Sequence, residues 1–358
     1  MSEVLLFSDV HIHPHKRKQD RLEDCLKTLD WVFQVAKNKG INDILFGGDL
    51  LHDRSKIDVF TYMKVYEVLK KHCTGKIRLY LLLGNHDLWY NDSTSVSSVT
   101  PFQALPGITV IGDICRKTVA GVKWDFIPFT HDPITALETL GEYDEPAKYA
   151  LGHLSIDGAK LNSHGTISDV VIEHDGEMVS VAAKMFAGYT RTFLGHYHAS
   201  QVLEGNVEYI GSPLQLSFGE AHQDKHIIVL DCETDKREYI INDFSPKHYY
   251  LKADQLDKHD LKGAFVSLLT DDMSSVDVAK IRKDILTTKG AASVNVRVSH
   301  KKIDEETHVV QDAIAVMLKE MSEDKMLERY VEEAGAEGLG KNRLLDFGKK
   351  IIEYQEAI

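Results

Sequence analysis

The chain has 358 residues, of which 18 are histidine, and a formal net charge of −13. So acidic a chain argues against a protein that simply coats nucleic acid with basic side chains. Four cysteines without a CxxC pair exclude a disulfide scaffold and a zinc ribbon. We expect neither a membrane span nor a signal peptide, because no apolar stretch is long enough and the first residues lack a basic region before an apolar one.

Strands and helices are expected to alternate in the first part of the chain, because short apolar runs are separated by apolar residues at helical spacing. The expected elements are, in order, a strand at 4–7, a helix from Leu22 to Ala36 that stops at Gly40, a strand at 44–46, a helix at 57–72 and a strand at 77–83. Each strand runs into a polar loop. This pattern is typical of α/β folds, whose sites form at the carboxyl ends of strands.

From about residue 108 to 242 the pattern favours strands over helices, and 91–107 is expected to be a loop. The expected strands are 108–111, 123–129, 148–152, 192–195, 207–210 and 226–231. Short strands separated by turn residues suggest a second sheet that packs on the first. We therefore predict an α/β fold over 1–242, a sandwich of two sheets flanked by helices.

The character of the sequence changes near residue 243. Strands at 265–269 and 293–298 flank a helix at 275–287, which predicts a small α+β domain at 243–304. The remaining residues, 305–358, are expected to form helices at 308–321, 323–334 and 341–355.

Five short motifs rich in His, Asp and Asn follow expected strands. They are Asp9-Val10-His11, Gly48-Asp49-Leu50-Leu51-His52, Gly84-Asn85-His86-Asp87, Gly152-His153 and Gly195-His196-Tyr197-His198. One such motif alone is more often a turn or a structural histidine, but five of them at strand ends indicate one site. Imidazole, carboxylate and amide groups suit Mn, Fe or Zn better than Ca. Seven candidate ligands fit two ions, roughly 3.5–4 Å apart, that share a bridging carboxylate.

The set DxH, GDxxH, GNHD, GH and GHxH resembles that of the calcineurin-like metallophosphoesterases. Within this superfamily the chain resembles the SbcD-type nuclease subunits of double-strand-break repair, which in eukaryotes act in meiotic recombination. His52 and Asp87 close their motifs where the protein phosphatases of the superfamily carry Asp and Glu. The segment 211–220, GSPLQLSFGE, resembles a GSPLPLSF-type segment of bacterial SbcD proteins. The resemblance covers residues 1–230.

The resemblance implies a role for each matching residue. It assigns Asp9, His11 and His198 to one metal ion, Asn85, His153 and His196 to a second, and Asp49 to a bridge between them. His86 would lie beside the scissile phosphate, where it stabilises the transition state or protonates the leaving oxygen. His52 would orient His86 or the phosphate, and Asp87 would orient His86, although a purely structural role for either stays open.

The implied protein is a DNA nuclease subunit with 3′–5′ exonuclease and single-strand endonuclease activity. Its ions would be Mn²⁺, with Mg²⁺ or Fe²⁺ as alternatives. It would act on double-stranded and single-stranded DNA ends as a homodimer, in the cytoplasm of a bacterial or phage-infected cell or with its nucleoid. The sequence has no Walker A motif, so an SbcC-type ABC ATPase would be a separate chain.

In this scheme 1–242 is the nuclease domain, 243–304 caps it and reads DNA, and 305–358 binds the ATPase, unless those helices pack on the cap domain instead. Lys16, Arg17 and Lys18 are candidates for contacts with the DNA backbone. The alternative is that they form a solvated start to the first helix.

Two other functions remain open. One is a protein or small-phosphoester phosphatase on the same fold, since Arg54 lies near the place where such enzymes carry an arginine that binds phosphate. The other is a non-enzymatic scaffold with a decayed site, against which the complete ligand set argues.

Overall fold

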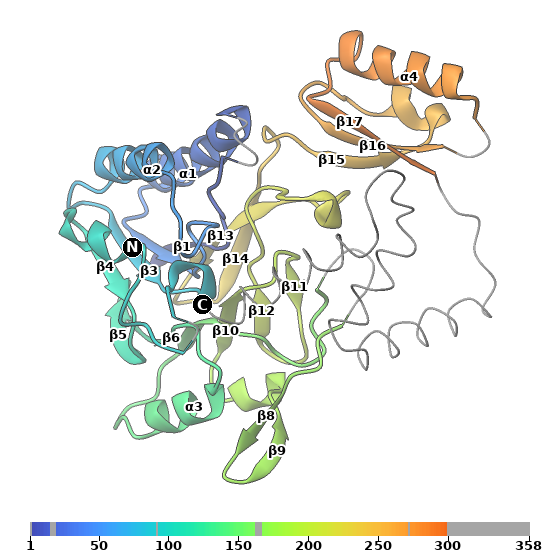
Figure 1. The fold of residues 1–358 in the computed structure, drawn as a ribbon. Coiled ribbons are helices and arrows are strands. Elements are labelled where there is room, and N and C mark those ends of the chain that lie inside the picture. The colour runs from blue at the N-terminus through green and yellow to red at the C-terminus, as the bar shows by residue number, and fades with distance from the viewer. Residues whose placement is uncertain (1, 15–18, 91, 162–166, 271–272, 299–358) are drawn as a thin grey trace, which may run out of the picture. The chain divides into compact units, whose positions relative to one another are not determined.

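The computed structural model describes residues 2–14, 19–90, 92–161, 167–270 and 273–298. The chain divides into two compact units, Met1–Arg297 and Val298–Ile358, and nearly all described residues belong to the first. In that unit two six-stranded sheets are stacked between helices (Figure 1). The predicted sandwich of two sheets flanked by helices is therefore confirmed. Of the helices in the described ranges, none has the length and apolar character to span a membrane.

The first sheet carries the strands that lead into three of the motifs. Its strands, in spatial order, are β14 (Lys236–Ile241), β13 (His226–Asp231), β1 (Glu3–Phe7), β2 (Asp43–Phe46), β3 (Arg78–Leu82) and β4 (Ile108–Ile111). From β1 to β4 neighbours run parallel, and in their register Leu5 faces Ile44 and Leu45 faces Tyr80. β13 is antiparallel to β1. The carboxyl ends of β1, β2 and β3 therefore lie side by side at one edge.

The second sheet carries the other two motifs. Its strands, in spatial order, are β11 (Gln201–Val202), β12 (Val207–Tyr209), β10 (Arg191–Gly195), β7 (Tyr149–His153), β6 (Val122–Ile127) and β5 (Cys115–Val119). The four inner strands run parallel, whereas each edge strand is antiparallel to its neighbour. The sequence did not predict β5 and β11, because edge strands carry mixed polar residues and β11 has only two residues.

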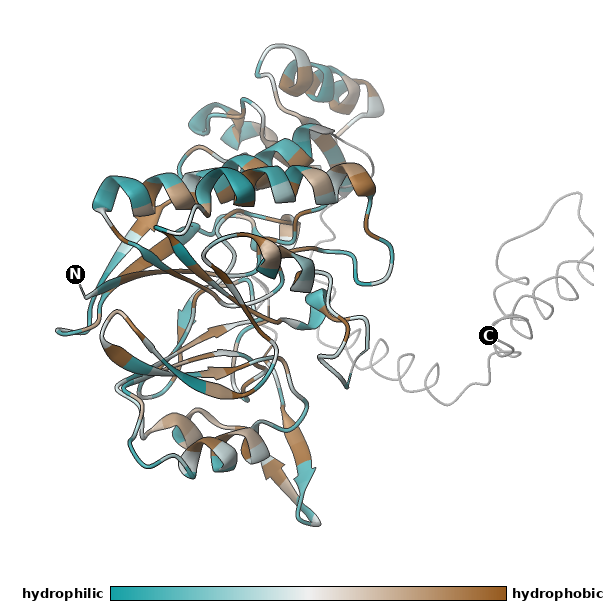
Figure 2. Cartoon of the chain, turned by 90° about the vertical axis from the view of Figure 1, so that its left-hand side faces the viewer, coloured by the Kyte–Doolittle hydropathy of each residue, from teal (hydrophilic) through white to brown (hydrophobic). Residues whose placement is uncertain are grey.

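Helices cover the outer face of each sheet. They are α1 (Gln19–Lys39) and α2 (Val59–His72) on the first sheet and α3 (Pro133–Gly141), next to the hairpin of β8 (Val171–His174) and β9 (Glu177–Ser180), on the second. Side chains alternate along β1: Leu5 and Phe7 pack with Phe33 of α1, whereas Leu6 packs with Trp124 of the second sheet. In Figure 2 hydrophilic residues gather on the long helix α1 over the first sheet, while the stacked strands carry many hydrophobic residues.

The ends of the first helices follow from local chemistry. Gly40 takes a φ of +71°, a conformation that favours glycine just after a helix. Asp58 caps α2, because its side chain accepts a hydrogen bond of 2.9 Å from the N–H of Thr61. The helix expected at 57–72 thus begins two residues later.

Short 3₁₀ turns occupy several connections: Asn85–Asp87, Thr100–Ala104, Ala183–Phe186, Phe218–Glu220 and Ala253–Lys258. The second of these lies in the segment 91–107, which we expected to be a loop throughout. The nine-residue helix α3 was also not predicted, because it spans less than three turns.

A third, three-stranded sheet follows the sandwich along the chain. It consists of β15 (His248–Leu251), β16 (Phe265–Thr270) and β17 (Ser293–Val298), with α4 (Ser275–Thr287) between the last two strands. Leu251, Val266, Leu268 and Ile285 form a separate core. β15 was not predicted. The boundaries 243–304 stay a prediction, and the helices expected at 308–321, 323–334 and 341–355 lie outside the described residues.

Candidate metal centre

All five motifs lie at the carboxyl ends of strands. Three follow β1, β2 and β3, which are parallel neighbours in the first sheet, and two end or follow β7 and β10, which are parallel neighbours in the second. Because the two sheets are stacked, these two sets of strand ends meet. The structure accordingly brings together side chains from all five motifs.

Four residues of the motifs have a strained backbone conformation. Asp9, His11, Asp49 and His196 have φ values of 55°, 46°, 63° and 95°, in the region that L-residues rarely adopt. Each such residue costs of order 1–3 kcal/mol, and such strain is concentrated at functional sites. The site also leaves no room at Gly84, where a Cβ atom would meet the carboxylate of Asp49.

One group of potential ligands consists of Asp9, His11 and His198, whose ligand atoms all lie within 4.8 Å of one another. The Nε2 atoms of His11 and His198 are 3.0 Å apart, and Nε2 of His11 is 3.9 Å from Oδ1 of Asp9. These nitrogen and oxygen atoms converge on one point, as the ligands of a single ion do.

A second group is centred on Asn85. Its Oδ1 lies 3.1 Å from Nε2 of His153 and 3.0 Å from Nδ1 of His196. His153 comes from β7 and His196 follows β10, so this group joins the two sheets. An amide oxygen and two imidazole nitrogens at this spacing also suit a divalent ion.

Asp49 lies between the two groups. Its Oδ2 is 3.4 Å from Nε2 of His11 and 3.4 Å from Nε2 of His153. Its Oδ1 accepts a hydrogen bond of 2.7 Å from the N–H of His86. One carboxylate oxygen therefore faces both groups, which is the position that a bridging ligand needs.

Two of the imidazoles are held in the tautomer that a metal ligand requires. Nδ1 of His153 donates to the carbonyl of Gly47 at 2.7 Å, and Nδ1 of His198 donates to Oε1 of Glu220 at 3.0 Å. In each case Nε2 is the ring nitrogen that faces the site. Outer partners of this kind fix the orientation of histidine ligands in metalloproteins.

The charges of the site shift several pKa values. Burial raises the pKa of Asp9 and lowers the pKa of His196 to about 3. Burial also disfavours the charged forms of Asp49 and His153, but their mutual attraction outweighs it. It holds the pKa of Asp49 below its usual range and raises the pKa of His153 to about 9.

The residues present fit divalent cations. Asp9 and Asp49 are buried carboxylates, and in the described part of the chain their ion pairs are with histidines rather than with Lys or Arg. A buried carboxylate without a permanent cation is unfavourable. Two divalent ions would compensate these charges, so the donor set suits a dinuclear site.

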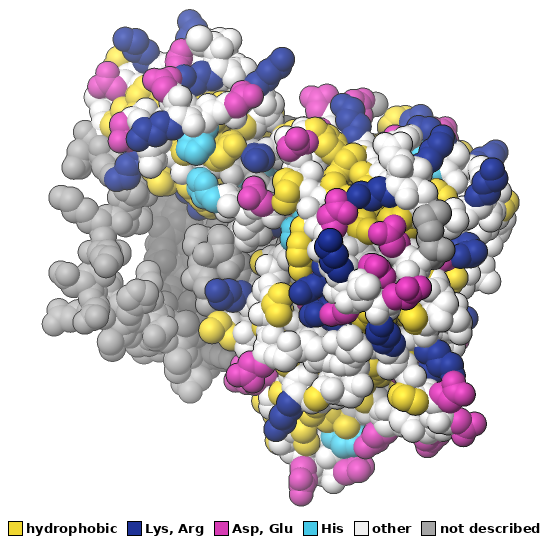
Figure 3. Space-filling view, turned by 180° about the vertical axis from the view of Figure 1, so that it is seen from behind, with side chains coloured by type: hydrophobic (Ala, Val, Ile, Leu, Met, Phe, Trp, Pro, Cys, Tyr) yellow, Lys and Arg dark blue, Asp and Glu magenta, His cyan; other side chains and the backbone are white. Residues whose placement is uncertain are grey.

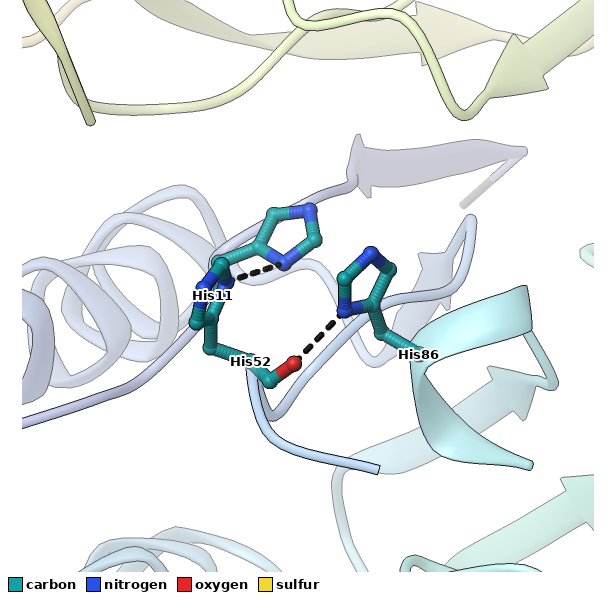
Figure 4. A group of neighbouring side chains, drawn as sticks. All are labelled: His11, His52 and His86. Carbon is teal, nitrogen blue, oxygen red and sulfur yellow. Dashed lines mark hydrogen bonds between the residues drawn. The ribbon is translucent and has the colours of Figure 1, made fainter. Parts of the chain in front are cut away.

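His86 and His52 lie at the edge of this centre, against His11 (Figure 4). Nδ1 of His86 donates to the carbonyl of His52 at 2.6 Å, and their rings stack with centroids 5.4 Å apart. Nδ1 of His52 lies 3.4 Å from Nδ1 of His11. The three rings form a further group with ligand atoms within 4.8 Å. His86 is half-buried and His52 exposed, so both can reach a substrate.

The contacts of Asp87 differ from those expected of a residue that orients the ring of His86. Its buried carboxylate accepts hydrogen bonds from the backbone N–H groups of Gly84, Asp49 and Leu50, at 3.0, 2.9 and 3.0 Å. These contacts tie the loop after β3 to the loop after β2. Asp87 therefore positions the two loops that carry Asp49 and His86.

Two residues near the site escaped the sequence analysis. Glu220 holds the ring of His198, and Lys225 pairs with Glu220 at 2.7 Å. The one available signal was the segment 211–220, which ends at Glu220. Lys16, Arg17 and Lys18 lie outside the described residues. Arg54 donates to the carbonyl of Leu88 at 3.2 Å.

Comparison with known proteins gives a family for this geometry. The family model described as calcineurin-like phosphoesterase matches residues 2–200, a range that contains all five motifs. Exonuclease subunit 1 of Enterobacteria phage T4 is 25% identical over 219 residues, which cover 58% of each chain. SbcD, from the nuclease SbcCD of Escherichia coli strain K12, is 24% identical over 274 residues, 67% of each chain. Double-strand break repair protein mus-23 of Neurospora crassa is 33% identical over 72 residues, 20% of this chain and 10% of that protein.

Proposed function

The chain belongs to the calcineurin-like phosphoesterase family, and from this we propose that it is a metal-dependent phosphodiesterase that cleaves DNA. The family resemblance predicted from the five motifs is confirmed. The observation that carries the proposal is the position of Asp49, whose Oδ2 lies 3.4 Å from a histidine of each ligand group. A carboxylate so placed can bridge two ions.

In the proposed site Asp9, His11 and His198 hold one ion, Asn85, His153 and His196 hold the other, and Asp49 binds both. When bound, such a pair activates water and clamps the oxygens of a phosphoryl centre. We assign Mn²⁺ to both positions, with Mg²⁺ or Fe²⁺ as alternatives; imidazole, carboxylate and amide ligands accommodate such ions.

His86 supplies the proton in this proposal. Its Nδ1–H is fixed on the carbonyl of His52 at 2.6 Å, which leaves Nε2 to carry the proton that the leaving oxygen receives. The side chain of His52 stacks on the same ring and limits its rotation. Asp87 acts through the backbone, by holding the loops of Asp49 and His86 together.

DNA is the substrate that the names of the relatives favour, since exonuclease subunit 1 and SbcCD are nucleases. We propose 3′–5′ exonuclease and single-strand endonuclease activity at DNA ends. In the view of Figure 3 the basic and acidic side chains of the described residues are interspersed. We propose that DNA contacts involve the ions and local cations such as Lys16, Arg17 and Lys18.

Partners follow from the same relatives. The name of SbcCD marks SbcD as one part of a larger nuclease, which supports an SbcC-type ATPase partner that residues 305–358 would bind. A homodimer is supported by exposed apolar side chains at the start of α2 and in the loop after β3. They are Val59, Phe60 and Met63, and Trp89 and Tyr90, which are 47–77% exposed. We place the complex in the cytoplasm of a bacterial or phage-infected cell, where it can associate with the nucleoid.

The test is digestion of an end-labelled linear DNA duplex by the purified full chain, with Mn²⁺ and with a chelator. We expect Mn²⁺-dependent release of labelled nucleotides, which Asp49→Asn abolishes. A small aryl phosphate tested in parallel separates nuclease from phosphatase, the second candidate function. Hydrolysis of the aryl phosphate without cleavage of DNA would overturn the proposal.

A further inference from the structure

We propose that Glu220, held in place by Lys225, is a positioning residue for His198 and thereby sets the affinity of one of the two metal positions. This inference rests on the metal centre of the proposed function, but not on its substrate. Glu220 belongs to the 3₁₀ turn Phe218–Glu220 and lies 22 positions after His198. It therefore comes from a different part of the chain than the five motifs.

The contact between Glu220 and His198 is direct. Oε1 of Glu220 accepts a hydrogen bond of 3.0 Å from Nδ1 of His198, on the opposite side of the ring from the Nε2 that faces His11. A carboxylate in this position fixes the orientation of the ring and makes its other nitrogen a stronger metal ligand.

Lys225 fixes Glu220 and His198 together. Its Nζ donates to Oε2 of Glu220 at 2.7 Å, to the carbonyl of His198 at 2.8 Å and to Oγ of Ser212 at 3.0 Å. Ser212 in turn donates to the same Oε2 at 2.8 Å. Glu220 thus holds the ring of His198, and Lys225 holds its backbone carbonyl oxygen.

The pair is nearly inaccessible to solvent, since Glu220 and Lys225 are each only 5% exposed. Buried ion pairs are seldom a source of stability, because both charges lose their hydration. Here the ammonium group of Lys225, 2.7 Å from Oε2, compensates the charge of the Glu220 carboxylate, and Ser212 donates a further hydrogen bond to the same oxygen. Glu220 therefore accepts a charge-assisted hydrogen bond, which is stronger than one between neutral groups.

The contacts of Glu220 and Lys225 with His198 affect only one of the two metal positions. His153, in the other group, has the carbonyl of Gly47 as its outer partner instead of a carboxylate. Asn85, which binds neither Glu220 nor Lys225 in the contacts of the described chain, anchors that second group. Loss of Glu220 should therefore lower the affinity for the ion at Asp9, His11 and His198 and leave the affinity for the ion at Asn85 unchanged.

The experiment measures Mn²⁺ binding to the metal-free full chain by isothermal titration calorimetry, with electron paramagnetic resonance to distinguish single from paired ions. The variants are Glu220→Gln, and Glu220→Gln with Lys225→Met, which removes both charges together. The matched control is Glu208→Gln, because Glu208, on β12 of the second sheet, is also buried and pairs with Arg237 on β14 of the first sheet.

For both variants we expect one Mn²⁺ to bind about 10–100-fold more weakly and the other to keep its affinity, with loss of the paired-ion signal. The control should bind both ions as the wild type does. Unchanged affinity for both ions in the double variant, or equal weakening of both, would overturn the proposal. If the wild type binds two ions but leaves DNA intact, the proposed function fails while this inference stands.

Discussion

The Oδ1 atom of Asn85 lies 3.1 Å from Nε2 of His153, although the two residues are 68 positions apart and belong to different sheets: Asn85 follows β3 and His153 ends β7. The ligand groups are therefore assembled across the interface between the sheets. Any ion bound there would link the two halves of the sandwich. We therefore expect bound ions to stabilise the folded protein in addition to any role in catalysis.

Removal of the ions should lower the melting temperature of the protein. A ligand that binds the folded state alone stabilises it by RT ln(1 + [L]/Kd), about 2.7 kcal/mol per ion at 100 times Kd. We expect the thermal transition to fall when EDTA is added and to return when Mn²⁺ is restored. Calorimetry of the Asp49→Asn variant is the control. A transition in this variant that shifts as much as in the wild type would contradict a site centred on Asp49.

Asp49→Asn should reduce the bound metal and abolish activity. The amide keeps the size of the side chain but removes the charge that faces both His11 and His153. We expect the metal content, measured by elemental analysis, to fall from two ions toward one or none. The matched control is Asp231→Asn on β13, far along the chain from the motifs. Two tightly bound ions in Asp49→Asn would refute the bridging role.

His86→Asn should leave metal and DNA binding intact but slow cleavage. In the proposed mechanism His86 donates a proton and does not hold an ion, and loss of a general acid lowers rates by about 10²–10⁴-fold. Single-turnover kinetics with labelled duplex measure the step directly. Metal content is checked in parallel, since His86 also lies near His11 and His52. A variant with wild-type kcat would exclude this role.

The sandwich, and the clustering of the His, Asp and Asn side chains of the five motifs, could be predicted because both depend on strong local patterns. Buried parallel strands read as apolar runs, so β1, β2, β3, β7 and β10 were found within two residues of their ends. Their carboxyl ends carry the motifs, and the rule that sites form there brought the candidate ligands together. The edge strands β5, β11 and β14 were missed because their residues alternate or are polar.

The supporting contacts could not be predicted, because they depend on tertiary neighbours. Asp87 binds backbone N–H groups from two loops, and no sequence pattern distinguishes such an acceptor from one that binds a histidine ring. Glu220 and Lys225 are charged residues in a loop, where exposure is the usual expectation. Only the fold reveals that they are buried beside His198.

Asp87→Asn should destabilise the protein through its backbone contacts. An amide cannot accept all three N–H bonds, and its own NH₂ group would face donors. Each N–H donor left buried without its partner costs about 1–3 kcal/mol. Urea unfolding of the metal-free protein should show a loss of this order, which a role confined to His86 would not produce. Unchanged unfolding with reduced kcat would contradict the structural role.

His248→Phe should remove part of the acid sensitivity of the fold. The ring of His248 stacks on Phe265 with centroids 4.7 Å apart and meets the edge of Phe218 at 5.0 Å. Burial lowers its pKa to about 4, with Arg21 and Lys225 adding to the shift and Glu220 opposing it. The unfolded chain takes up a proton below pH 6.5, whereas the folded chain does not until about pH 4.

Between these two values the wild type should therefore lose stability as the pH falls, because protons favour the unfolded state. The expected loss from this group is about 1 kcal/mol between pH 6.5 and 5.5. Phenylalanine keeps the ring stacking but cannot take up a proton. We subtract the free energy of unfolding of the wild type from that of the variant, both from urea titrations. This difference should be constant above pH 7.5 and become more positive toward pH 5. Parallel pH profiles would show that His248 is not titrating in this way.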